Sequence, residues 1–411
     1  MADSAVLNLH KNLRQAGERW AVFLGAGASY DYGIPTMGEI AEILRGQIRE
    51  SRPDHGVNAP TLDLLKTLCP GDPQTSASWN IEDLLTRLSQ VLDATGDAHS
   101  AFAPVTTAIG ESEIPAAAIR QASEELIGFM AEMCGLSSHV HLGRGSGRVD
   151  YLADFFLAMA SFGKTASQRI RVFSTNIDLC VEAALVRLSQ RPRADRRTDF
   201  VLVDGFESAI LPTFNMGCYT RELSSFGERC SVWLWKLHGS INWTFSQAIA
   251  ADGSGGGEAS YSDQSIIVRK VDSDMWDDLA NCGALCAMQP PASRRIVIFP
   301  TPAKYSQTYT VPYMDLFESF RRTLEEIELL ICVGTSFPDQ HIRSAIRSFI
   351  ERDNTLLFVV DPQLTSGHLR SFFGASRSVQ PVIGMGFAQF VQEFKALDVV
   401  PGTAKPTERT Q

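Results

Sequence analysis

The sequence contains a series of short apolar runs that are continuous rather than alternating with polar residues, and this pattern restricts the folds open to it. Such runs are typical of strands covered on both faces, and these occur in parallel sheets flanked by helices. The runs are WAVFLGAG (20–27), RIRVFSTNID (169–178), SVWLWKLHGSINW (231–243), RRIVIFPTP (294–302), LLICVGTSF (329–337) and TLLFVVDP (355–362). We therefore predict an α/β fold with a Rossmann-like parallel sheet flanked by helices.

A helical segment is expected to interrupt this sheet. Residues 34–48 carry apolar positions at helical spacing, directly after the first run. Between about residues 50 and 165 the helical patterns are 80–94, 115–136 and 150–162, with few strand candidates. The predicted parts are a sheet domain (1–48 and 166–398), a helical insertion (49–165), a flexible loop (251–260) and a flexible tail (399–411).

Composition argues against several classes of function. The chain has 411 residues, and no stretch reaches the ~20 apolar residues of a membrane helix. Residues 1–16 lack the pattern of a secretion signal, so a cytoplasmic location is expected. The eight cysteines are scattered without a CxxC pair, which fits a reducing compartment. The net charge of -10 argues against broad, sequence-independent nucleic-acid binding.

The first turn has the features of an anion-binding loop. Gly25 and Gly27 lie between an apolar run and a helical pattern, in the string GAGAS. Glycines allow close backbone approach to a ligand, and a helix start offers unpaired N–H groups to a phosphate. The spacing is GxGxS rather than GxGxxG, and glycines in such turns can also be required for steric reasons alone. Both interpretations remain open for the isolated motif.

Polar residues follow two other runs. Asn176 can supply an amide donor and a carbonyl acceptor, although Asn176 or Asp178 could instead cap the next helix. His238 stands at a strand end before Gly239 and could reach into a cleft, although a lone histidine is more often structural. These residue types are suited to orienting a substrate and moving a proton.

The last two runs also end in polar groups. Thr335 and Ser336 follow a glycine and could bind phosphate or ribose, as in nucleotide-binding folds. Asp361 could accept hydrogen bonds from ribose hydroxyls, or could belong to an Asp-Pro turn.

The motifs GAGAS, GIP, TNID, KLHGS and GTS occur in this order, and on that basis the sequence resembles the sirtuin superfamily. The resemblance covers about residues 18–47 and 168–395 and implies an NAD-binding sheet domain. The implied contacts are Gly25, Ala26, Gly27 and Ser29 with the pyrophosphate; Gly33, Ile34 and Pro35 near nicotinamide; Thr175 with nicotinamide and its ribose; and Gly334, Thr335, Ser336 and Asp361 on the adenosine side.

The same resemblance implies the catalytic residues. His238 matches the catalytic base of sirtuins. Asn176 is expected to position the attacking water or the ribose, and Asp178 to hold the nicotinamide carboxamide or the adjoining loop.

Three departures distinguish the chain from protein-deacylating sirtuins. A Thr-Met-Gly tripeptide (36–38) follows GIP in place of Asp-Phe-Arg, so the usual arginine is missing. Two CxxC pairs that would form a zinc site are absent, and Cys282 with Cys286 is a poor substitute, so no zinc is expected. FPTPAKYSQTYTVPY (299–313) occupies the region comparable to the FGE segment that clamps an acyl-lysine peptide.

The chain instead resembles the prokaryotic immune branch of the superfamily, whose members hydrolyse NAD. NIEDLL (80–85) and PAKY (302–305) resemble segments of that branch. The expected activity is that of an NAD+ hydrolase, with NAD as substrate and ADP-ribose and nicotinamide as products, which depletes NAD in antiphage defence by abortive infection. The alternatives are a non-catalytic NAD or ADP-ribose sensor that regulates a partner ATPase or nuclease, and a protein deacylase.

The resemblance also implies partners. A homo-oligomer that works with a separately encoded HerA-type ATPase is expected, and a short Argonaute or another phage sensor is the alternative partner. The helical insertion would either make oligomer or partner contacts or cover the active site.

Overall fold

The computed structural model describes most of the chain. The described residues are 4–68, 81, 84–85, 87–88, 106–109, 112–136, 142–163, 168–191, 200–206, 213–222, 226–227, 229–245, 267–269, 295–297 and 312–397. The predicted loop at 251–260, the PAKY segment, Cys282 with Cys286, and the tail at 399–411 lie outside these residues.

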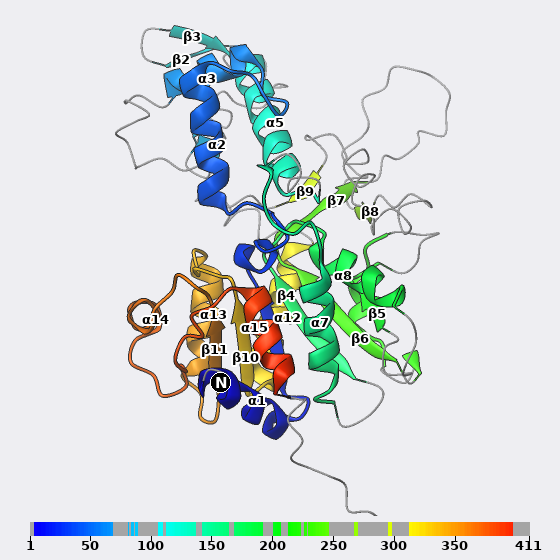
Figure 1. Cartoon of the computed structure of the whole chain (residues 1–411). Helices are drawn as coiled ribbons and strands as arrows, with labels where there is room; N and C mark the ends of the chain where they lie inside the picture. Colours follow the sequence, from blue (N-terminus) through cyan, green and yellow to red (C-terminus); the bar gives the residue numbers. More distant parts are fainter. Residues whose placement is uncertain are drawn as a thin grey trace, which may run out of the picture.

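A six-stranded parallel sheet forms the centre of the protein (Figure 1). Its strands, in spatial order, are β11 (Leu356–Val360), β10 (Leu329–Val333), β1 (Trp20–Leu24), β4 (Arg169–Ser174), β6 (Cys230–Lys236) and β5 (Phe200–Val203). The predicted fold class is confirmed. The sequence patterns missed β5, whose four residues form too short a run to stand out.

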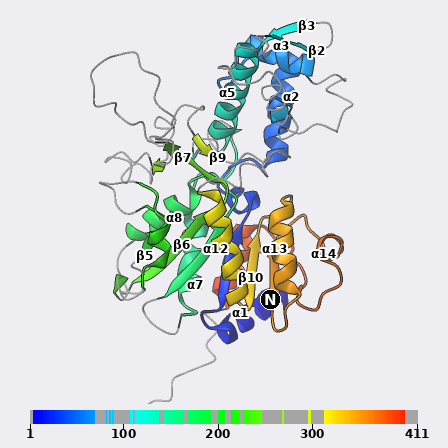
Figure 2. The ribbon, with the colours of Figure 1, turned by 180° about the vertical axis from the view of Figure 1, so that it is seen from behind.

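Both faces of the sheet are covered, as the continuous apolar runs predicted. In β1, Val22 and Leu24 belong to one hydrophobic core, whereas Ala21 and Phe23 belong to the other. Figures 1 and 2 show the helices in two layers. The first core is covered by α1 (Ser4–Ala16), α7 (Asp150–Ala160), α8 (Cys180–Ser189) and α15 (Phe387–Ala396), and the second by α12 (Tyr313–Glu326), α13 (Gln340–Ile350) and α14 (Ser366–Phe373).

A group of helices lies beyond the carboxyl ends of the strands (Figures 1 and 2). It consists of α2 (Met37–Glu50), α3 (Ala59–Leu68), α5 (Ala116–Met133) and the hairpin β2 (Thr106–Ile109) with β3 (Ser112–Pro115). Helix α2, predicted as part of the sheet domain, lies beside α3, whereas α7, predicted in the insertion, packs against α8 and α15. The hydrophobic core continues from the sheet into this group, and the domain boundaries stay a prediction.

The protein also contains a second, antiparallel sheet, and it includes one strand that was predicted to join the parallel sheet. Its strands are β8 (Ile267–Arg269), β7 (Gly239–Phe245) and β9 (Arg295–Val297). The run at 294–302 was predicted to join the parallel sheet, and this was wrong because β9 pairs antiparallel with β7. An apolar run indicates burial, but it carries no information about which strand will pair with it. Strand β7 was not separated from β6 within the run at 231–243, and the β2–β3 hairpin was not predicted because each of its strands has only four residues.

The described residues were compared with the requirements of a membrane-spanning helix and of a metal site. Within them, no helix is both long and apolar enough to span a membrane. In the same part of the chain, no group of three or more His, Cys, Asp or Glu side chains is arranged to hold a metal ion.

Candidate functional site

One row of paired residues crosses the carboxyl end of the sheet and brings the predicted motifs together. The row is Val360, Val333, Leu24, Ser174 and Lys236, each paired with the next. Gly25 and Gly334 directly follow their members of this row, and Asn176 and His238 stand two residues beyond theirs. Open parallel sheets bind ligands at this edge, in particular where the strand order reverses. Here the reversal lies at β1, between β10 and β4.

The two glycine turns pack against each other at the ends of β1 and β10. The N–H of Gly27 donates to the carbonyl oxygen of Gly334 over 2.8 Å. A Cβ on Gly25 would lie 2.6 Å from the same oxygen, and a Cβ on Gly27 would lie 2.7 Å from the Gly334 Cα. An approach this close requires glycine. The steric interpretation of both glycines is therefore supported, whether or not a ligand binds there.

The helix predicted over residues 34–48 is present as α2, but it does not begin directly after the first turn. A single 3₁₀ helix, η1 (Ala26–Ser29), follows Gly25, and α2 begins only after a further loop. The N–H of Gly27 is already bonded to the neighbouring turn, and the N–H of Ala28 donates to the Gly25 carbonyl over 2.9 Å. The expectation of unpaired helix N–H groups was therefore wrong for these two amides.

Replacing Gly334 with alanine is expected to destabilise the protein by about 2 kcal/mol or more. Gly334 has a φ of 61°, and its added Cβ would lie 2.3 Å from the carbonyl carbon of Gly27. Gly56, in the turn between Asp54 and Val57, is the control, because its φ is 76° but an added Cβ would have nothing within 4 Å. Urea unfolding of both alanine variants separates close packing from backbone strain. Equal losses of stability would contradict the packing role.

Asn176, Ser29 and Asp178 form one chain of side-chain hydrogen bonds. Nδ2 of Asn176 donates to the Gly25 carbonyl (2.9 Å) and to Ser29 Oγ (3.2 Å). Ser29 Oγ donates to Asp178 Oδ2 over 2.8 Å, and Asp178 Oδ1 accepts from the amide of Cys180 over 2.9 Å. Asp178 therefore accepts from the first amide of α8, although Leu179 is the N-cap residue of that helix, and it also holds Ser29. Since Nδ2 of Asn176 is engaged, Oδ1 is the group that it can offer to a ligand hydroxyl or a water.

A buried ion pair contacts the backbone of Asp178, the last member of this series of hydrogen bonds. Nζ of Lys236 lies 2.9 Å from Glu182 Oε1, and the two side chains are 3% and 11% exposed. Lys236 also donates to the backbone carbonyl of Asp178 and, over 3.0 Å, to Ser240 Oγ. Burial raises the pKa of Glu182, and the charge of Lys236 opposes that rise. The pair links the loop of Asn176 to the turn of His238, and the sequence patterns did not reveal it.

His238 meets a carboxylate that sequence reasoning missed. His238 Nε2 lies 3.4 Å from Asp339 Oδ2, and both residues are buried. Asp339 stands three residues after the GTS motif, directly before α13. Its position near the carboxyl end of β10 was the signal available in the sequence.

Two thiols close to Asp178 are held neutral. Burial raises the pKa of Cys134 to about 12, and the charge of Asp178 adds to the effect. Burial also raises the pKa of Cys180 well above its usual range, with the same carboxylate contributing. Neither side chain supplies a thiolate near neutral pH, so nucleophilic thiol chemistry is not favoured here.

The predicted adenosine-side residues lie at the ends of β10 and β11. Thr335 is buried, and its Oγ1 accepts from the amide of Phe337 over 3.1 Å, whereas Ser336 is exposed. Asp361 Oδ1 accepts from the amides of Gln363 (2.8 Å) and Leu364 (3.0 Å). The Asp-Pro turn is therefore present, and a role of Asp361 in ribose binding stays a prediction.

The loop of Gly33, Ile34 and Pro35 is buried. It is held by residues 145–147, which are far from it in the sequence. The amide of Gly147 donates to the Tyr32 carbonyl over 3.0 Å. A Cβ on Gly145, which has a φ of 74°, would lie 2.3 Å from the same oxygen. This segment belongs to the predicted insertion, so the insertion contacts the predicted nicotinamide loop.

An arginine from the same segment reaches the start of α2. Arg144 pairs with Glu39, whose side chain also forms a capping box with Thr36. Burial works to raise the pKa of Glu39, but Arg144 and the Thr36 hydrogen bonds lower it below the usual range. Arg144 therefore lies close to residues 36–38, the tripeptide after GIP that lacks the arginine of protein-deacylating sirtuins.

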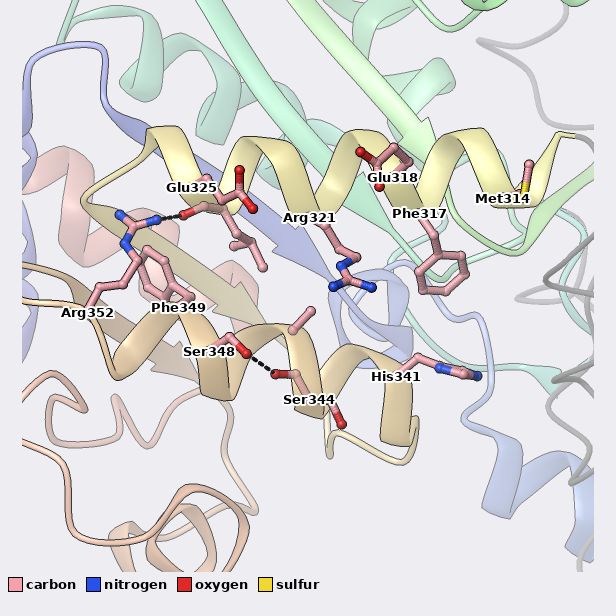
Figure 3. Close-up of a pocket in the computed structure, with 12 residues that line it drawn as sticks. Met314, Phe317, Glu318, Arg321, Glu325, His341, Ser344, Ser348, Phe349 and Arg352 are labelled. Atoms are coloured by element: carbon pink, nitrogen blue, oxygen red, sulfur yellow. Dashed lines mark hydrogen bonds between the residues drawn. The ribbon is translucent and has the colours of Figure 1, made fainter.

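A separate groove of about 470 Å³ lies between α12 and α13. Figure 3 shows Phe317, Arg321 and His341 along it. Its lining comes from these two helices and from Arg352 just after α13, and not from the strand ends.

The parallel sheet with helices on both faces defines an α/β protein, a class in which ligands bind at the carboxyl edge of the sheet. A family model described as a SIR2-like domain matches residues 170–379, more than half of the chain. The chain therefore belongs to the SIR2-like domain family.

Solved structures of Sir2 proteins are similar to this chain. One, described as a Sir2 homolog–NAD complex, is 14% identical with a TM-score of 0.38, and covers 95% of this chain and 94% of that one. Another, from work on the mechanism and regulation of Sir2 enzymes, is 14% identical with a TM-score of 0.40, and covers 96% and 99%. A Sir2–p53 peptide–NAD+ structure is 12% identical with a TM-score of 0.39, and covers 95% and 98%. No curated protein matches the chain.

Proposed function

We propose that this protein binds NAD+ at the carboxyl edge of its sheet and hydrolyses the bond between nicotinamide and ribose. The observation that carries the proposal is the shared row of strand ends, which brings the Gly25 turn, Asn176 and His238 to one edge. Family membership supports NAD+ as the ligand, and NAD is present in Sir2 structures of similar fold.

The chemistry requires an activated water and a stabilised sugar cation. The oxygen of water forms a bond to C1 of the ribose while the carbon–nitrogen bond breaks, and nicotinamide leaves as a neutral molecule with the bonding electrons. His238 accepts the proton released from the water and passes it to solvent. Asn176 holds the water or a ribose hydroxyl through Oδ1, since its Nδ2 is engaged with Gly25 and Ser29. The products are ADP-ribose, nicotinamide and one proton.

Asp178 and the buried loops have supporting roles in this proposal. Asp178 fixes Ser29, and through it Asn176, rather than acting in proton transfer. The loop of Gly33, Ile34 and Pro35 covers the nicotinamide side, and the helices beyond the strand ends help to exclude bulk water.

The biological role that fits such an activity is depletion of NAD during phage infection. We place the protein in the cytoplasm as a homo-oligomer that works with a HerA-type ATPase, with a short Argonaute or another phage sensor as the alternative partner. These assignments rest on the resemblance of the sequence to the immune branch of the sirtuins. Size-exclusion chromatography with light scattering, with and without a candidate ATPase, tests the assembly.

The activity is tested by incubating the purified chain with NAD+ and separating the products by liquid chromatography. Equal amounts of ADP-ribose and nicotinamide, formed without any acyl-lysine peptide, are expected. Formation of O-acyl-ADP-ribose only when such a peptide is added would instead identify a deacylase. Calorimetric binding of NAD+ or ADP-ribose without turnover, alone or with the ATPase, would identify a sensor.

A further inference from the structure

The contact between His238 and Asp339 spans a large part of the sheet. His238 follows β6 and Asp339 follows β10, and these strands are separated by β4 and β1. Strands lie about 4.8 Å apart, so the ends of β6 and β10 are roughly 14 Å apart. The loops after these strands must therefore reach across the edge to bring Nε2 within 3.4 Å of Oδ2. The contact is not a by-product of strand pairing.

The loop before Asp339 is bent in a way that costs free energy. Phe337 adopts a φ of 54°, a left-handed conformation that is unfavourable for an aromatic residue. The Phe337 amide donates to Thr335 Oγ1, and the Phe337 ring is 1% exposed, so local contacts hold the bend. This bend lies just before Asp339 and sets the direction from which the chain enters α13.

Asp339 occupies a capping position without capping. It is the residue before α13, where an aspartate commonly accepts from the backbone of the first turn. No such side-chain hydrogen bond is present. The carboxylate instead faces His238, and both residues are only 5% exposed. A buried carboxylate beside an imidazole orients the ring and favours its charged form.

We propose that Asp339 is the positioning residue of His238, holding the ring through Nε2 and stabilising the imidazolium formed when His238 accepts a proton. This inference rests on the proposed function for its kinetic consequence. The distance of 3.4 Å is longer than a standard hydrogen bond, as is common for catalytic contacts before substrate binds.

The kinetic test compares Asp339→Asn with Asp339→Glu. We expect Asp339→Asn to lower kcat by about 10² to 10⁴ and to change KM for NAD+ by less than about threefold, because Asp339 acts on the base and not on the substrate. Asp339→Glu retains the charge and is expected to keep a larger share of kcat. Asp353→Asn, the same change in an exposed turn, is the control. Wild-type kcat in Asp339→Asn, or equal losses in both Asp339 variants, would overturn the proposal.

A spectroscopic test separates this proposal from the proposed function. In protein labelled with ¹⁵N-histidine at a pH where the ring is neutral, the His238 signals, identified by their loss in His238→Gln, should show the proton on Nε2. The Asp339→Asn variant should alter this tautomer while the thermal unfolding midpoint stays close to that of the wild type. A proton on Nδ1 in the wild type, or no change in the variant, would overturn the positioning role. This holds even if the protein does not cleave NAD+.

Discussion

Replacing His238 with alanine is expected to lower the rate of NAD+ cleavage by about 10² to 10⁴, the usual contribution of a placed general base. The ring is buried at the edge where the Gly25 turn and Asn176 also lie, next to the carboxylate of Asp339. Alanine removes the imidazole that would accept the proton in the proposed reaction. The initial rate of nicotinamide release at saturating NAD+ measures the effect.

Asn176→Ala is the companion variant, and His368→Ala is the control. Asn176→Ala should lower the rate to a similar extent, because it removes the acceptor for the water or ribose and the contact to Ser29. His368 is exposed on α14, and its loss should leave the rate unchanged. Full activity in His238→Ala would exclude the proposed base. Equal losses in all three variants would indicate damage to the fold rather than to the site.

Replacing Lys236 with methionine is expected to reduce the free energy of unfolding by about 3–5 kcal/mol. Methionine keeps much of the volume but leaves the Glu182 carboxylate buried without its cation. Oε2 of Glu182 already lacks a hydrogen-bond partner among the described residues, so no second group there would compensate. Urea or guanidinium unfolding at neutral pH measures the loss.

The pH dependence of this loss identifies its cause. Burial already raises the pKa of Glu182, and removing Lys236 should raise it further. An acid whose pKa is higher in the folded state stabilises the fold below its unfolded value, near 4.5, and loses that contribution as the pH rises through the folded value. The deficit of Lys236→Met should therefore be smaller near pH 5 than near pH 8.

Lys395→Met is the matched control for the ion pair. Lys395 pairs with Asp154 over 2.7 Å, but its side chain is 46% exposed. Exposed pairs contribute about 0–1 kcal/mol, so this variant should lose little stability and show little change with pH. A loss in Lys236→Met no larger than in Lys395→Met would contradict the importance of the buried pair.

Much of the sheet could be predicted from local pattern. Strands β1, β4, β6, β10 and β11 all lie in runs whose continuous apolar character follows from burial on both faces. The same pattern assigned β9 to the wrong sheet, because a buried run does not specify its neighbour. Short elements such as β5 and the β2–β3 hairpin carry too few residues to stand out from their surroundings.

Local pattern also predicted which residues would stand at strand ends, but not how they would be connected. Asn176 and His238 were identified because polar side chains follow buried strands at the edge where parallel sheets bind ligands. The order of the strands places Asn176 and His238 after neighbouring strands, β4 and β6. It also brings Gly25 into contact with Gly334, because β1 pairs with β10.

The class of fold and the residues at each strand end could be predicted from the sequence, since they follow from the hydrophobic pattern along each strand. The same pattern indicated the edge of the sheet at which the candidate site lies. Three contacts could not be predicted: Lys236 pairs with Glu182, Asp339 faces His238, and residues 145–147 of the predicted insertion hold the loop of Gly33. These contacts join segments far apart in the chain. They depend on strand order and loop path, which are set by the packing of the whole core and not by local pattern.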